Sequence, residues 1–149
     1  KDGLLHTSWK GRFTVINKKP LFIVDGAHNA GAADKMAESV RHYFNGKKLI
    51  YIMGVFADKE YKIVLEKTAH FAEKIYTIET PDNPRALPAE ELAKAARVYN
   101  SSAESTKSIK DAVEKAFSCA GDDENSVILA FGSLSFIGAL TNAVEEYVG

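Results

Sequence analysis

Asp25 and His28 are the residues of this sequence best placed for chemistry, because they follow an apolar run, residues 21–24, that stops abruptly. A carboxylate at the end of a buried strand accepts hydrogen bonds either from the backbone of its own turn or from ligand hydroxyls such as those of ribose. His28, three residues later, is expected at the same edge of the sheet as Asp25. There it either contacts an anionic substrate or has a purely structural role. A phosphoacceptor aspartate is disfavoured, because Val24 stands where such domains have a second acid.

The turn after Asp25 leads into a helix expected over residues 29–44, where apolar residues recur at helical spacing and Asn29 is the predicted N-cap. Open α/β sheets bind phosphorylated ligands at such a strand, turn and helix N-terminus. However, the sequence contains neither a dinucleotide-binding glycine pattern nor a P-loop lysine motif. We therefore expect the turn to contribute to a nucleotide site without holding a triphosphate by itself.

Ser133 is a further candidate, since Gly132-Ser133 directly follows the buried strand expected at residues 126–131. Glycine there lets the backbone approach a ligand, and the serine either donates a hydrogen bond to that ligand or caps the final helix. The four histidines share no metal-ligand spacing, and no nucleophile elbow is present. We therefore predict no metal ligands in this chain.

Apolar runs and helical patterns alternate along the chain and must position these residues. We expect strands at residues 13–16, 21–24, 49–53, 75–78 and 126–131, and a short edge strand at 103–106. We expect helices at residues 29–44, 58–72, 90–99, 109–117 and 135–147. This order predicts an α/β fold: a Rossmann-like, mainly parallel sheet with helices on both faces and an N-terminal antiparallel hairpin strand.

The carboxyl ends of parallel strands meet at one edge of a sheet, so we expect the functional groups there. That edge would hold residues 25–29, 54–59 and 132–135, together with a loop at residues 80–88. The loop contains three of the four prolines, which disfavour helix and sheet, and it is predicted to be exposed. Loops in this position commonly carry function.

With 149 residues, of which 46% are hydrophobic, the chain is long enough for one domain with a full core. A net charge of -1 argues against a nucleic-acid partner. The single cysteine, Cys119, excludes an internal disulfide framework and fits a reducing compartment. No apolar run reaches the ~20 residues that span a bilayer, and no signal peptide is evident. We therefore expect a cytoplasmic protein with no membrane partner.

Five short motifs run through nearly the whole chain. They are Trp9-Lys10-Gly11-Arg12-Phe13, Asp25-Gly26-Ala27-His28-Asn29-Ala30, Ala57-Asp58-Lys59-Glu60-Tyr61, Asn83-Pro84-Arg85-Ala86-Leu87 and Phe131-Gly132-Ser133-Leu134. In type and order these motifs resemble the C-terminal, glutamate ligase domain of folylpolyglutamate synthase, which is often bifunctional with dihydrofolate synthase. That enzyme is a member of the Mur ligase family.

The resemblance implies an ATP-dependent ligase that forms an acyl-phosphate on folate, or on dihydropteroate, which the amine of L-glutamate then attacks. By the same resemblance Arg12 and Asp25 bind the nucleotide, with Asp25 at the ribose. His28 and Ser133 would be the catalytic residues on the side where glutamate and the acyl-phosphate meet.

Residues 1–149 would then form the Mur ligase C-terminal domain, with residues 1–10 as the end of an interdomain linker. The resemblance assigns the P-loop, the magnesium ligands and a modified lysine to an N-terminal domain that this chain lacks. ATP and Mg²⁺ are therefore the implied cofactors, the N-terminal domain of the same polypeptide is the implied partner, and the isolated chain is expected to be inactive.

Two alternatives stay open on the residues alone. One is a stand-alone Rossmann-like module that binds a small nucleotide without catalysis. The other is a Mur-type ligase with a cell-wall substrate, which Asn83-Pro84-Arg85-Ala86 and Phe131-Gly132-Ser133-Leu134 disfavour. The choice between folate extension and dihydrofolate synthesis depends on a pterin pocket outside this chain.

Overall fold

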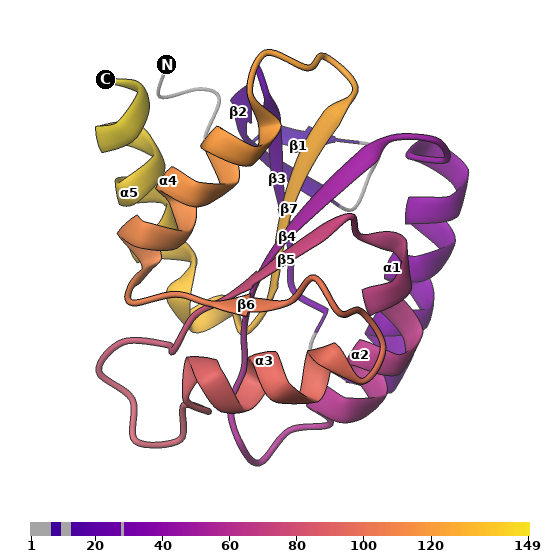
Figure 1. The fold of residues 1–149 in the computed structure, drawn as a ribbon, viewed down its shortest axis with the longest axis vertical. Coiled ribbons are helices and arrows are strands. Elements are labelled where there is room, and N and C mark those ends of the chain that lie inside the picture. The colour runs from indigo at the N-terminus through magenta and orange to yellow at the C-terminus, as the bar shows by residue number, and fades with distance from the viewer. Residues whose placement is uncertain (1–6, 10–12, 28) are drawn as a thin grey trace.

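The computed structural model of the chain describes residues 7–9, 13–27 and 29–149. Its centre is a seven-stranded sheet in the order β1-β2-β3-β7-β4-β5-β6 (Figure 1). The strands are β1 (Thr7–Trp9), β2 (Phe13–Lys18), β3 (Leu21–Asp25), β4 (Lys48–Gly54), β5 (Lys74–Thr77), β6 (Glu104–Ser105) and β7 (Ser126–Gly132).

The sheet is mainly parallel. β1 pairs with β2, and β2 with β3, in antiparallel fashion, whereas the pairs from β3 through β7, β4 and β5 to β6 are parallel. The predicted α/β fold with an N-terminal hairpin is therefore confirmed. Strand β1 was not expected, and it lies in the segment that we assigned to a linker. It pairs through its backbone with β2, from Thr7 opposite Val15 to Trp9 opposite Phe13. A strand of this length is too short to show the alternation of polar and apolar residues that predicts a strand from the sequence.

Helices cover both faces of the sheet (Figure 1). They are α1 (Ala30–Tyr43), α2 (Tyr61–Thr68), α3 (Ala89–Arg97), α4 (Ile109–Ala120) and α5 (Ile137–Val148), with single 3₁₀ turns η2 (Ala69–Phe71) and η3 (Leu134–Phe136). The first three helices pack against one face through a cluster that includes Met36, Leu65 and Leu92. Helices α4 and α5 pack against the other face through a cluster that includes Phe117 and Leu140.

The central strands supply both hydrophobic clusters. In β7, Leu129 belongs to the cluster under α1 to α3, while its neighbour Ile128 belongs to the cluster under α4 and α5. Successive side chains of a strand point to opposite faces, so a strand covered on both faces is apolar throughout. This burial makes β7 and β4 a rigid base for the loops that follow them.

The predicted helix over residues 58–72 is wrong at both ends. The helix α2 begins at Tyr61, and its N-cap residue Glu60 makes no side-chain capping bond. Asp58, the expected start, instead uses its carboxylate to pair with Arg85. The helix ends at Thr68 and the chain continues as the 3₁₀ turn η2. The residues before Tyr61 are therefore available to shape the edge of the sheet.

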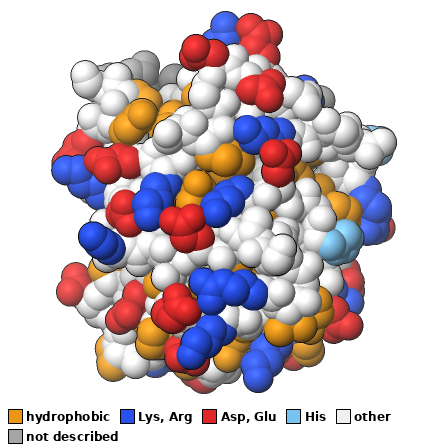
Figure 2. Space-filling model, viewed as in Figure 1, with side chains coloured by type: hydrophobic (Ala, Val, Ile, Leu, Met, Phe, Trp, Pro, Cys, Tyr) orange, Lys and Arg blue, Asp and Glu red, His pale blue; other side chains and the backbone are white. Residues whose placement is uncertain are grey.

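Acidic and basic side chains are interleaved on the face over β6 and α3 that Figure 2 shows. Glu104 of β6 accepts Lys74 Nζ at 2.9 Å and Lys115 Nζ at 3.0 Å. The hydrogen bonds from these two lysines hold the pKa of the Glu104 carboxyl below its ordinary value. Charges along the short edge strand discourage pairing with another sheet.

Candidate functional site

The carboxyl ends of β3, β7 and β4 lie side by side at one edge of the sheet. Asp25, the last residue of β3, is in register with Phe131 of β7, and Gly132 of β7 is in register with Gly54 of β4. Asp25 is only 7% exposed. The expectation that these three strand ends mark one edge of the sheet is confirmed.

Gly54 and Gly132 allow the ends of β4 and β7 to approach closely. Gly132 has a φ of 123°, which L side chains rarely adopt, and a Cβ there would collide with the carbonyl oxygen of Gly54. A Cβ on Gly54 would collide with the side chain of Ile78. The close approach of Gly132 in the structure is thus to the β4 backbone, and it brings the segments after both strands together.

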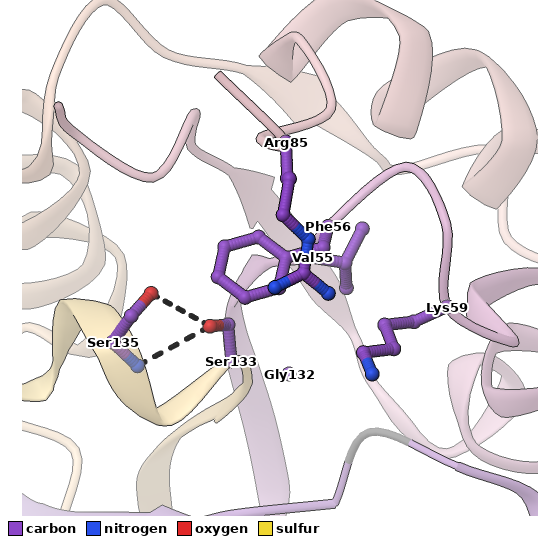
Figure 3. Close-up of a pocket in the computed structure, with 7 residues that line it drawn as sticks. All are labelled: Val55, Phe56, Lys59, Arg85, Gly132, Ser133 and Ser135. Atoms are coloured by element: carbon purple, nitrogen blue, oxygen red, sulfur yellow. Dashed lines mark hydrogen bonds between the residues drawn. The ribbon is translucent and has the colours of Figure 1, made fainter. Parts of the chain in front are cut away.

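A pocket of about 240 Å³ opens between these two segments (Figure 3). The residues that line it are Val55, Phe56, Lys59, Arg85, Gly132, Ser133 and Ser135. Arg85 extends toward the pocket from the loop after β5 and Lys59 from the loop after β4, and Ser133 stands at the end of β7 (Figure 3). Two cations and two hydroxyls around an apolar wall are suited to binding a small anionic group.

Ser133 is buried, and its hydroxyl contacts Ser135 twice. The two Oγ atoms are 2.7 Å apart, and the backbone N–H of Ser135 donates to Ser133 Oγ at 3.2 Å. This contact resembles a cap, but it lies at the turn η3 and not at α5, whose N-cap is Phe136 without a side-chain bond. Ser133 therefore does not cap the final helix: its hydroxyl holds the turn after β7, and the residue lines the pocket.

The proline-rich loop is fastened to the segment after β4. The N–H of Ala57 donates to the carbonyl of Arg85 at 2.7 Å, and the N–H of Leu87 donates to the carbonyl of Val55 at 3.0 Å. Within the loop, Asn83 Oδ1 accepts the N–H of Arg85 at 2.9 Å. These backbone contacts place Arg85 above the pocket, so this loop does carry residues of the candidate site.

The two cations of the pocket have different surroundings. The Arg85 guanidinium lies over the ring of Phe56, 4.5 Å from its centroid, and pairs with Asp58. Hydrogen bonds from Arg85 hold the pKa of the Asp58 carboxyl below its ordinary value. Lys59 is exposed and forms no ion pair with any described side chain.

The N-terminus of α1 is capped by two side chains. Asn29 Oδ1 accepts the N–H of Ala32 at 2.9 Å, which confirms the predicted N-cap. The Glu60 carboxylate, from the loop after β4, accepts the N–H of Ala30 at 3.0 Å. This second bond ties the loop that carries Lys59 to the turn that follows Asp25.

Of the residues predicted for the site, Ser133 lines the pocket and Asp25 lies at the neighbouring strand end. Asp25 is not among the residues that line the pocket. Arg12 and His28 lie outside the described residues. The sequence did not identify Lys59 or Arg85 as site residues, although both stand in loops expected at this edge.

Among the described residues, no group of three or more His, Cys, Asp or Glu side chains is arranged to hold a metal ion. No helix in the described part of the chain has the length and apolar character needed to cross a membrane.

Comparison with known proteins identifies the family. Residues 11–134 match the family described as "Mur ligase, glutamate ligase domain". The chain therefore belongs to the Mur ligase family as a glutamate ligase domain. Over 145 residues the chain is 28% identical to the dihydrofolate synthase/folylpolyglutamate synthase of Bacillus subtilis (strain 168). This match covers 97% of the chain and 33% of that protein. The resemblance drawn from the five motifs is confirmed.

A solved structure agrees with this assignment. The folylpolyglutamate synthase of Mycobacterium tuberculosis, solved in complex with ADP and AMPPCP, matches with a TM-score of 0.79 at 25% identity over 93% of this chain and 33% of that one. The bifunctional enzyme of Yersinia pestis matches with a TM-score of 0.75 at 25% identity over 96% of this chain and 33% of that one. The glutamate ligase domain thus spans about a third of the length of these relatives.

Proposed function

We propose that this glutamate ligase domain belongs to an ATP-dependent ligase that adds L-glutamate to folate or to dihydropteroate. The single observation that carries the proposal is the pocket in which Lys59, Arg85 and Ser133 converge at the carboxyl ends of β4 and β7. Two basic side chains and a hydroxyl match a carboxylate of an acidic amino acid in charge and hydrogen bonding. The kinship with folylpolyglutamate synthases supports the choice of glutamate.

In this proposal the residues of the chain bind and orient glutamate. Lys59 and Arg85 hold a carboxylate, and Ser133 donates a hydrogen bond from the end of β7. The bound amine then attacks an acyl-phosphate on the folate, which forms the amide and releases phosphate. His28 is the second catalytic residue in this proposal, as the family resemblance implies. Fixing the amine at its target lowers the entropic cost of the reaction.

ATP, when bound, supplies the phosphoryl group that activates the folate carboxyl. Asp25 fits a role at the nucleotide sugar, because it is a buried carboxylate at the end of a parallel strand. Arg12 is the second nucleotide contact in this proposal. We assign magnesium binding and the phosphate cradle to an N-terminal P-loop domain of the same polypeptide, as the family resemblance implies. The match to only 33% of the Bacillus subtilis relative supports a further domain of this kind.

The test is the steady-state kinetics of glutamate addition by the full-length protein. Removing one charged partner of a carboxylate costs about 1.5–3 kcal/mol, so Arg85→Ala and Lys59→Ala should each raise the KM for glutamate roughly tenfold or more. The KM for ATP should stay unchanged in both variants, whereas Asp25→Ala should raise the KM for ATP. Lys62→Ala, which removes an exposed lysine outside this pocket, is the control. An unchanged KM for glutamate in both cation variants would refute the site, and a full-length protein that only binds nucleotide would refute the ligase assignment.

A further inference from the structure

Asp58 holds the side chain of Arg85 in one orientation. Arg85 Nε donates to Asp58 Oδ2 at 3.2 Å, and Nη2 lies 3.1 Å from each of the two carboxylate oxygens. The ring of Phe56 supports the face of the guanidinium at 4.5 Å from its centroid. The Asp58 carboxylate bonds to the edge of the guanidinium and the Phe56 ring packs on its face. Together they restrict the long Arg85 side chain, which is otherwise free to rotate.

The pairing uses only one edge of the guanidinium. Nε and Nη2 face Asp58, and Nη1 has no hydrogen-bond partner among the described residues. Arg85 lines the pocket and Asp58 does not. Asp58 thus occupies Nε and Nη2 and leaves the N–H groups of Nη1 for a ligand.

The same pairing sets the charge of the pocket. The carboxylate of Asp58 offsets the charge of Arg85, while Lys59, the adjacent residue, makes no ion pair with a described side chain. The Asp58–Arg85 pair is about half exposed, with side-chain accessibilities of 59% and 49%, so its direct contribution to stability is small. Its effect on the direction of the guanidinium does not depend on that contribution.

We infer that Asp58 is a positioning residue for substrate recognition: it orients Arg85 so that Nη1 meets one carboxylate, while Lys59 supplies the uncompensated charge. This inference rests on the proposed function of the pocket. It means that the pocket selects a carboxylate through the geometry of a fixed guanidinium as well as through charge. If Asp58 acted through its charge alone, removing it would strengthen glutamate binding, because an acid beside an anion site repels the anion.

The test is a double-mutant cycle in the full-length ligase, with Asp58→Ala, Arg85→Ala and the double variant. Freeing one long side chain that must be ordered again on binding should raise the KM for glutamate about fivefold in Asp58→Ala. The KM for ATP should change less than about twofold, because Arg85 contacts glutamate and not the nucleotide in this proposal. In the Arg85→Ala background, the Asp58 substitution should have no further effect.

The matched control is Asp34→Ala, which removes a similarly exposed aspartate. Asp34 pairs with Lys67 at 2.8 Å, and neither residue lines the pocket. Asp58→Asn provides a second measure, since its amide oxygen still accepts one bond from Arg85, and its KM for glutamate should lie between wild type and Asp58→Ala. A KM for glutamate that falls or stays unchanged in Asp58→Ala would overturn the inference. If Arg85→Ala and Lys59→Ala also leave this KM unchanged, the proposed site fails as well, so the two failures are distinguishable.

Discussion

Replacing Gly132 by alanine should destabilise the domain more than its small change in volume suggests. The φ of 123° is unfavourable for a residue with a side chain, which costs about 1–3 kcal/mol. The new Cβ would also collide with the carbonyl oxygen of Gly54, and relieving such overpacking costs a further ~1–3 kcal/mol. We therefore expect a loss of about 4 kcal/mol, which lowers the Tm of a domain of this size by roughly 8–16 °C.

Equilibrium urea unfolding and thermal melting, followed by circular dichroism, measure this loss. Gly138→Ala is the matched control, since a Cβ there meets no atom within 4 Å and the residue lies in α5. Alanine favours helices over glycine by up to ~1 kcal/mol, so the control should be neutral or slightly stabilising. A Gly132→Ala variant within about 0.5 kcal/mol of the wild type would refute the argument that Gly132 sets the approach of β7 to β4.

Two further substitutions test the interior and the start of α1. Tyr51→Phe removes the buried hydroxyl that donates to the carbonyl of Thr68 at 2.8 Å, and urea unfolding should show a loss of about 1–2 kcal/mol. Burial raises the pKa of Tyr51 well above its ordinary value, so above about pH 10 this phenol ionises only in the unfolded chain. The wild-type protein should therefore lose stability as the pH rises above about 10, and Tyr51→Phe should lose less over that range. Parallel curves of stability against pH would contradict this reasoning. Asn29→Ala removes the cap on the N–H of Ala32 and should cost about 1 kcal/mol in the same unfolding assay, whereas a loss of only a few tenths would show that Glu60 alone is sufficient at this helix end.

Much of the fold was predictable because local patterns and burial agree. The run before Asp25 and the run before Gly132 are apolar throughout, as expected for strands covered on both faces, and both are central strands. The start of α2 was not predictable from local signals. Asp58 is a favourable N-cap residue, but its carboxylate pairs with Arg85, which lies 27 positions away in the chain.

The sequence by itself determined the mainly parallel α/β sheet, the glutamate ligase family through its short motifs, and the position of Ser133 at the carboxyl edge. Those features follow from residue types and their order. Only the tertiary structure brought Lys59 and Arg85 to the same pocket as Ser133, because they stand in three separate loops. Their proximity depends on the contact between Gly132 and Gly54 and on the backbone bonds between the two loops after β4 and β5, and pairing between distant segments leaves no periodic pattern in a single sequence.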